Sequence, residues 1–349
     1  ETNVMGVIQR QYDSLGRASA LALRSLGEAG SAPYVVSYGF DSVGRFASVS
    51  SSVFSVTSVV DYSYLSDSDL VSGWTEANSG LSVTKGFEPQ RNLITQILNQ
   101  VGTNLISQFD YSNDQVGRRT QRIDAGVSSA TNSFGYNERS ELTNAVMSTN
   151  SFGYAYDPIG NRREATRNAV LETYLANSLN QYTNIHDGVT NSLTYDLDGN
   201  ILTDGAWTNA WNGENRLVCV QPLSPASGSK RVDFAYDYQG RRFRKVISVW
   251  TNDAWSVLST NLFLYDGWNV VSDVSRAGAQ VSTNSYTWGL DLSGSLQGAG
   301  GIGGLLSWTR SNDGKSFLYF ADGNGNITEL VDAGSPTNVV AHYAFDPFG

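Results

Sequence analysis

The sequence has very few of the residues on which disulfide-bonded, zinc-binding and membrane-spanning proteins depend. Its 349 residues include one cysteine, Cys219, and two histidines. A single cysteine cannot form an internal disulfide or a cysteine-based zinc site, and we interpret Cys219 as a small core residue. No apolar run of about 20 residues is present, so the sequence predicts no membrane span.

Basic residues are also in deficit. The chain has 23 Lys and Arg against 33 Asp and Glu, a net charge of -10. Domains that bind nucleic acid are commonly basic, so we expect no nucleic-acid partner and assign the charge to solubility. No secretion signal is visible at the start of the sequence. Because the chain starts with Glu1 and not with methionine, we expect an excised or processed piece.

Aromatic residues and glycine are abundant. The sequence contains 18 Tyr, 14 Phe, 8 Trp and 35 Gly, and 40% of its residues are hydrophobic. This hydrophobic content excludes a disordered polymer. Aromatic and β-branched residues interrupted by frequent glycine favour many short strands. The composition therefore predicts an all-β protein with almost no helix.

One hairpin unit recurs along the chain, and its clearest copy lies near residue 150. Phe152, Tyr154 and Tyr156 alternate with small residues, which is the period of a strand with one aromatic face. Asp157 and Gly160 then occupy the positions of a type I turn that favour these residues. The turn predicts positive φ angles at Gly160 and at the equivalent Gly240.

The intact copies share an aromatic residue, Asp, two variable residues, Gly, and Arg or Asn. They are Tyr12, Asp13, Gly16, Arg17; Phe40, Asp41, Gly44, Arg45; Tyr156, Asp157, Gly160, Asn161; Tyr195, Asp196, Gly199, Asn200; and Tyr236, Asp237, Gly240, Arg241. The first two are 28 residues apart (41 − 13), within the range of about 20–50 residues for stacked repeats. Further copies, longer or altered, begin at Phe87, Phe109, Phe134, Trp211 and Tyr265.

Two segments are less certain, and a second element recurs upstream of the turns. Residues 18–26 are rich in Ala and Leu but lie between two copies, and we favour a strand there. Residues 93–101 combine helical spacing with the place of a return strand, so both readings stay open. Four Thr-Asn pairs, at 131, 190, 260 and 283, each precede a turn by six residues and are predicted to mark the opposite hairpin end.

The repeated Tyr-Asp-x-x-Gly-Arg/Asn motif resembles the YD-repeat, or rearrangement-hotspot (Rhs), family. This family includes bacterial polymorphic toxins, the cocoon-forming components of insecticidal toxin complexes and the teneurins. The resemblance implies a long β-sheet that spirals into a hollow shell around a C-terminal toxic domain. It also implies an aspartate-dependent self-cleavage region after Gly349. Residues 346–349 resemble that region, but we interpret them as another repeat.

Other candidate sites are weak on sequence grounds. Residues 298–303 fit the dinucleotide pattern G-x-G-x-x-G, but no helix is expected to follow them. Asp322, Asn324 and Asn326 have calcium-loop spacing without the required Gly and Glu. His186 and His342 lie in no nucleophile motif. The arginines after the turn glycines are expected to pair with Asp across strands. We assign no catalytic residue, cofactor or metal.

Two functions remain open from the sequence. The first is a structural shell segment, a single array over residues 1–349 that is truncated at both ends and bends at 298–304. Its partners would be a C-terminal cargo domain of the same polypeptide and secretion or delivery machinery, and it would be secreted or at the bacterial cell surface. In such a wall the aromatics would pack sideways, rung against rung, without a central core. The alternative is a recognition module that binds glycan or protein through its aromatic strands.

Overall fold

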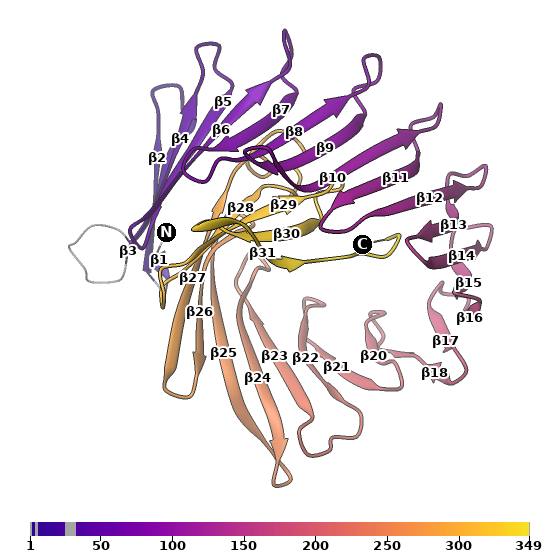
Figure 1. Cartoon of the computed structure of the whole chain (residues 1–349). Helices are drawn as coiled ribbons and strands as arrows, with labels where there is room; N and C mark the ends of the chain where they lie inside the picture. The colour runs from indigo at the N-terminus through magenta and orange to yellow at the C-terminus, as the bar shows by residue number, and fades with distance from the viewer. Residues whose placement is uncertain (1, 4–5, 25–32, 349) are drawn as a thin grey trace. The chain divides into compact units, whose positions relative to one another are not determined.

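The computed structural model describes residues 2–3, 6–24 and 33–348, and these residues form strands and turns without a helix (Figure 1). The prediction of an all-β protein built from repeated antiparallel hairpins is therefore confirmed. Residues 25–26 of the Ala- and Leu-rich segment, and Gly349 of the last motif, lie outside the described residues.

The strands belong to two antiparallel sheets and pair mainly with their neighbours in the chain. The first sheet comprises β1 (Thr2–Asn3), β2 (Gly6–Tyr12), β3 (Ala18–Arg24), β4 (Tyr34–Phe40), β5 (Phe46–Val53), β6 (Val56–Tyr64), β7 (Val71–Glu76), β8 (Leu81–Phe87), β9 (Ile94–Val101), β10 (Asn104–Asn113), β11 (Arg119–Gly126), β12 (Ala130–Tyr136), β13 (Leu142–Met147), β14 (Asn150–Tyr156), β15 (Arg162–Arg167), β16 (Val170–Ala176), β17 (Tyr182–His186) and β18 (Thr190–Ser192). The second comprises β19 (Thr194–Tyr195), β20 (Ile201–Thr203), β21 (Trp207–Trp211), β22 (Leu217–Pro222), β23 (Lys230–Tyr236), β24 (Arg242–Thr251), β25 (Ala254–Asp266), β26 (Asn269–Ala277), β27 (Gln280–Trp288), β28 (Leu305–Arg310), β29 (Ser316–Ala321), β30 (Ile327–Asp332) and β31 (Ser335–His342).

The strand register shifts at the residue before each repeated turn. The shift falls between Gln11 and Tyr12 in the β2–β3 pair and between Ala155 and Tyr156 in the β14–β15 pair. The extra residue lies in the return strand, at Ser19 and at Arg163, so each shift is a β-bulge just beyond the loop. The aromatic residue before Asp is the last residue of its strand and lies on the turn side of this bulge.

The chain divides into two compact units. Unit 1 contains Glu1–Thr131, Leu264–Asp273 and Ser282–Gly349, and unit 2 contains Asn132–Phe263 and Val274–Val281. In unit 1, strands of the two sheets pack face to face. Leu81 and Phe109 of the first sheet share a buried cluster with Leu318, Phe320 and Val331 of the second.

A second cluster in unit 1 joins β2–β6 to residues of the other sheet. Val36 and Val49 pack there with Val271, Leu290 and Leu306. The expectation of sideways packing without a central core is therefore wrong for unit 1, which has the two-layer core of a sandwich. The repeat motif carries no signal for this contact, because the facing strands are far apart in the sequence; Leu81 and Phe320, for example, are separated by 239 residues (320 − 81).

Unit 2 packs differently. Its buried cluster contains Leu142, Ala145 and Met147, flanked by aromatic residues of the neighbouring strands, among them Phe134 and Phe152. These side chains come from the consecutive strands β12, β13 and β14. In this unit the aromatic rungs pack from hairpin to hairpin, as the repeat predicts.

The structure shows the conformation of the segments that the sequence left undecided. Residues 94–101 form β9, so the helical spacing there is incidental to a return strand. Strand β3 occupies the described part of residues 18–26. The Thr-Asn prediction holds in part: the pairs at 131 and 190 lie at the starts of β12 and β18, whereas those at 260 and 283 lie within the longer strands β25 and β27.

Candidate functional site

The repeated turn is the most regular site in the molecule, and one side chain fixes its backbone. In the copy at Asp157, Oδ1 accepts hydrogen bonds from the backbone N–H groups of Ile159 (3.0 Å) and Asn161 (2.9 Å). The Gly160 N–H donates to the Asp157 carbonyl at 3.1 Å, and the Asp157 N–H donates to the Asn161 carbonyl at 2.9 Å. Asp157 thus satisfies the amides that the loop leaves open.

The residue at the glycine position takes a left-handed backbone. Gly160 and Gly240 have φ angles of 94° and 83°, so the predicted positive values are confirmed. Ser140 and Asn215 occupy the same position in altered copies, with φ angles of 63° and 57°. A residue with a Cβ atom pays about 1–2 kcal/mol for this conformation, less for Asn, so Ser140 is the least suitable of the four.

The same caps recur in the other intact copies. Asp13, Asp41, Asp196 and Asp237 each accept hydrogen bonds from the backbone N–H groups two and four residues further on. These carboxylates are therefore engaged in holding the turn. The aspartates of these turns are structural caps.

Arginine after the glycine pairs with the aspartate of its own turn. Arg17–Asp13 and Arg241–Asp237 are 2.7 Å apart, and Arg45–Asp41 is 2.8 Å. The expected pairing across strands is thus replaced by a pair closed within each loop, because the turn brings these residues together. The hydrogen bond from Arg45 lowers the pKa of Asp41 below 3.8, against burial, which raises it.

The Arg or Asn also reaches forward to the next turn. Arg17 donates to the Gly44 carbonyl at 3.2 Å, and its guanidinium lies 3.8 Å from the centre of the Phe40 ring. Arg45 lies 4.3 Å from the centre of the Tyr64 ring in the same way. Equivalent forward hydrogen bonds join Arg45 to the Ser68 carbonyl, Asn161 to Asn180, Asn200 to Asn215, and Arg216 to the Asp237 carbonyl.

The aromatic residue that ends the strand before a turn reaches back to the preceding turn. The Tyr156 hydroxyl donates to the Leu142 carbonyl at 2.8 Å, and Leu142 is the fifth residue after the Asn137 that opens that turn. The same relation joins Tyr64 to Phe46, Tyr195 to Tyr182, Trp211 to Ile201 and Tyr236 to Leu217. We call the forward contact and the backward contact together the turn clasp.

The sequence search overlooked some turns and misread others. Asn177 caps a full copy, with Asn180 left-handed at a φ of 64°, but Ala176 stands where the aromatic residue belongs. The sequence signal for this copy is an Asn at the cap position and another at the left-handed position. The copy at Glu88 is wider than predicted, since its left-handed residue is Asn92.

The copy expected at Tyr265 is wrong. Strand β25 continues to Asp266, and Gly267 and Trp268 form a two-residue loop to β26. The Asp266 carboxylate accepts a hydrogen bond from Arg10 at 2.6 Å. The absence of both variable residues between Asp266 and Gly267 changes the loop length, and with it the turn type.

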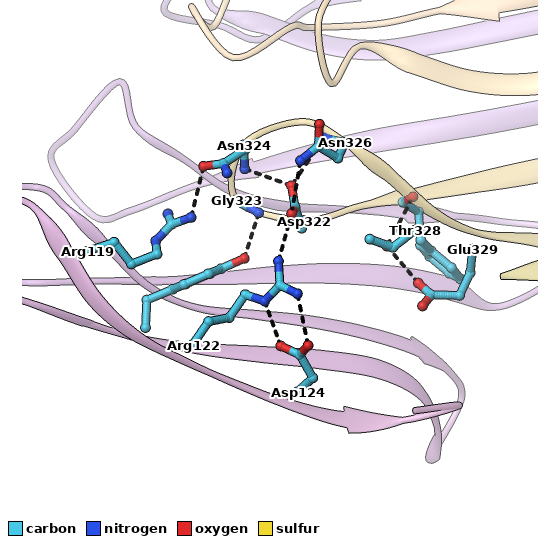
Figure 2. A network of polar contacts seen from close by, with 11 residues as sticks. Arg119, Arg122, Asp124, Asp322, Gly323, Asn324, Asn326, Thr328 and Glu329 are labelled. Carbon is cyan, nitrogen blue, oxygen red and sulfur yellow. Dashed lines mark hydrogen bonds and ion pairs between the residues drawn. The ribbon is translucent and has the colours of Figure 1, made fainter. Parts of the chain in front are cut away.

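A buried ion-pair cluster in unit 1 surrounds the turn between β29 and β30 (Figure 2). Asp322 Oδ1 accepts the N–H groups of Asn324 (2.9 Å) and Asn326 (3.1 Å), as in a YD turn. Its Oδ2 faces Arg122 of β11 at 3.3 Å, and Arg122 also holds Asp124 through two hydrogen bonds. The residues with calcium-loop spacing thus form a turn whose carboxylate is occupied by N–H donors.

Two further contacts fasten this turn to β10 and β11. The Gly323 N–H donates to the Tyr111 hydroxyl at 2.7 Å, and Arg119 donates to Asn324 at 2.8 Å. Burial raises the pKa of Tyr111, so its hydroxyl stays protonated at neutral pH. We call Arg122, Asp124, Asp322 and Tyr111 the β11 lock.

The other candidate residues from the sequence make contacts within the protein. In residues 298–303, the N–H groups of Ala299 and Gly301 donate to the Asp291 carboxylate at 2.6 and 3.1 Å. In a nucleotide site, such backbone N–H groups would instead bind phosphate. His186 lies 3.0 Å from the Thr190 hydroxyl on an exposed hairpin. His342 lies 3.2 Å from Glu329. Among the described residues, no helix has the length and apolarity to cross a membrane.

The fold and the turn clasp define a tandem repeat of antiparallel hairpins. No family model matches the sequence. It is 27% identical over 217 residues to a tRNA3(Ser)-specific nuclease WapA of Bacillus spizizenii and, over an equal length, to a tRNA nuclease WapA of Bacillus subtilis strain 168. These matches cover 60% of this chain and only 8% of each relative.

Solved structures share the fold over nearly the whole chain. A Photorhabdus luminescens Tc holotoxin pore matches with a TM-score of 0.57 and 12% identity, over 99% of this chain and 20% of that one. A TcdB2–TccC3–Cdc42 structure matches with a TM-score of 0.56 and 11% identity over the same shares. Together with the repeated Tyr-Asp turns and the similarity to the WapA proteins, this fold supports the resemblance to the YD-repeat (Rhs) family that the sequence predicts.

Proposed function

We propose that this chain is a wall segment of a β-shell that encloses a C-terminal cargo domain of the same polypeptide. The turn clasp carries the proposal. Each clasp joins one hairpin to the next through the same few contacts, so the array extends by adding hairpins. A sheet that grows in this way is suited to enclose a volume, whereas a catalytic site needs a local and unique arrangement of groups.

The chemistry of the site supports a structural role without catalysis. The turn carboxylates accept backbone N–H groups, the arginines pair within their own loops, and the Asp291 carboxylate accepts N–H groups of the loop at 298–303 that resembles a phosphate site. We therefore propose that any enzymatic activity belongs to the cargo and that this segment requires no cofactor or metal. The two relatives are named as nucleases, and the matched region spans 8% of their length.

The proposed setting follows from the same role. The cargo domain is the main partner, secretion or delivery machinery is a second, and nucleic acid is not a partner of this segment. The protein would act outside the bacterial cell or at its surface, which agrees with matches to a Tc holotoxin pore and to WapA proteins. Enclosure would keep an active cargo away from the cell that makes it.

Protease protection of the complete protein tests the proposal. The complete gene product is purified and treated with protease, first with the β-array intact and then after mild denaturant has opened it. We expect the cargo domain to survive in the first condition and to be digested in the second. Digestion of the cargo beside an intact array, together with tight glycan binding by the array, would instead support a recognition module.

A further inference from the structure

Lys85 lies on the core-facing side of β8 and has no counter-charge. Leu81 and Val83 precede it on the same face of the strand and belong to a buried cluster of unit 1. The Lys85 side chain is itself partly buried. Among the described residues, none forms a hydrogen bond, an ion pair or a ring contact with its amine. Because burial penalises an ammonium group that has no partner, this position needs an explanation beyond packing.

A small cavity between the two sheets of unit 1 adjoins Lys85. Its volume is about 40 Å³, more than the about 10–15 Å³ that one water molecule needs. Most of the residues around the cavity are apolar, and they include Trp74, Val83, Ile94, Ile97, Leu292 and Leu306. The cavity therefore suits a group of only a few atoms that carries no net charge.

The carboxylate that lines this cavity, Asp322, is already engaged by other groups. Its Oδ1 accepts the N–H groups of Asn324 and Asn326, and its Oδ2 faces Arg122 at 3.3 Å. Burial lowers the pKa of the Lys85 amine below the ordinary 10.5, and no charge in the described part of the chain offsets this. More of this amine is thus unprotonated at neutral pH than in a lysine surrounded by water.

We propose that Lys85 is a reactive amine that forms an imine with a small uncharged aldehyde. An unprotonated lysine in an apolar pocket is a nucleophile toward carbonyl carbon. Its nitrogen attacks the carbonyl carbon, and a C=N bond replaces the C=O bond. The carbonyl oxygen leaves as water with the two hydrogens of the amine, so the step consumes no oxidant or reductant. This modification site is independent of the proposed wall function.

The surroundings of Lys85 select the class of reactant. A short aldehyde such as propionaldehyde is small and uncharged, whereas an anionic carbonyl compound would have to leave water for apolar walls. The same walls limit the access of the water that hydrolyses an imine. The geometry therefore favours a short neutral aldehyde over a keto acid or a phosphorylated sugar.

Competitive labelling of the lysines tests the proposal. The chain has four, Lys85, Lys230, Lys245 and Lys315, so peptide mass spectrometry follows each of them separately. The folded chain is treated briefly at pH 7 with propionaldehyde and cyanoborohydride, which reduces each imine to a stable propylamine. We expect labelling of Lys85 to be on the order of tenfold faster than labelling of the exposed Lys230, because more of the Lys85 amine is unprotonated.

Two controls separate the cavity from the general reactivity of lysine. In concentrated urea the cavity is lost, and the four lysines should be labelled at similar rates. Lys315→Met removes an amine that is paired with Asp332 at 3.6 Å, and it should leave the labelling of Lys85 unchanged. Lys85→Met keeps an unbranched side chain and should abolish the fast labelling.

The comparison within the unaltered chain decides the proposal even if Lys85→Met fails to fold. Labelling of Lys85 that is no faster than labelling of Lys230 in the folded chain would overturn it. A preference for Lys85 that persists in concentrated urea would also overturn it, because the effect would then be independent of the cavity.

Discussion

At single positions of the repeat, backbone conformation decides which residues fit. Asn replaces both the Asp cap and the left-handed Gly in the Asn177 copy, because its side-chain oxygen Oδ1 accepts the same backbone N–H groups and its backbone tolerates positive φ. This is why a search for the intact motif overlooks that copy. The intact turns follow from local rules alone, and the sequence therefore predicts them well.

Ser140 and Gly160 offer a reciprocal test of the left-handed position. Ser140→Gly should raise the free energy of unfolding by about 0.5–1 kcal/mol, because Ser140 has a φ of 63°. Gly160→Val should lower it by about 1–2 kcal/mol for the same reason. Urea denaturation of both variants measures the effect. Two changes of the same sign would show that backbone conformation is not the cause.

The Asp41–Arg45 pair should make stability depend on acid pH. The folded-state pKa of Asp41 lies below its ordinary 3.8, so the pair contributes fully above that value and its contribution is lost as pH falls through the lowered pKa. Asp41→Asn keeps a cap but removes the charge. The difference in urea midpoint between the two proteins should therefore narrow below about pH 4. A difference that stays constant down to pH 2 would contradict this.

Between neighbouring hairpins, the Tyr-Asp pair serves two turns at once. Asp237 caps its own loop while the Tyr236 hydroxyl donates to the Leu217 carbonyl at 2.8 Å, and Arg216 donates to the Asp237 carbonyl at 3.2 Å. The sequence shows that these residues recur together. It does not show the clasp, because the partner atoms are backbone carbonyls, which have no sequence signature.

Removal of one hydroxyl tests the backward contact. Tyr236→Phe should cost about 1 kcal/mol, since the Leu217 carbonyl loses its donor. Tyr12→Phe is the matched control, because it deletes the same atom from a ring that is 62% exposed, and it should change stability little. Thermal and urea denaturation supply the measurement. Equal losses of stability in the two variants would mean that the Tyr236 hydroxyl does not stabilise the protein through its hydrogen bond to the Leu217 carbonyl.

The β11 lock fastens elements that no sequence rule brings together. Arg122 and Asp322 are 200 residues apart in the chain, and the Asp322 side chain is fully buried. Arg122→Gln should cost about 3–5 kcal/mol, because it leaves two carboxylates without their cation. Arg91→Gln, at an exposed ion pair, should cost no more than about 1 kcal/mol. Similar costs for both variants would contradict the lock.

For the chain as a whole, the two units differ in how they are stabilised. Among the described residues, unit 1 has two buried clusters that draw on both sheets, whereas unit 2 has one small cluster between neighbouring strands. The sequence predicts the hairpin-to-hairpin packing of unit 2 but not the two-layer core of unit 1. That core depends on which distant faces meet, as with Leu81 and Phe320, and the motif is the same in both units.

Hydrogen exchange should record this difference. Amide protons of β8–β10 and β29–β30 should exchange more slowly than those of β14–β16, because larger buried clusters cover the former strands. Mass spectrometry of peptic fragments after timed exchange in heavy water gives the comparison. Slower exchange in β14–β16 would show that the clasp protects a strand better than a buried core does.

The turn clasp also has a consequence for how genes that encode such arrays change in length. Each hairpin offers the same aromatic ring, carbonyl and Arg or Asn to its neighbours, and one repeat can be as short as 16 residues, from Asp196 to Asn212 (212 − 196). An in-frame duplication or deletion of one such block of codons leaves the flanking hairpins able to close on each other. Genes of this kind can therefore change length by recombination, one hairpin at a time, and still encode a continuous sheet.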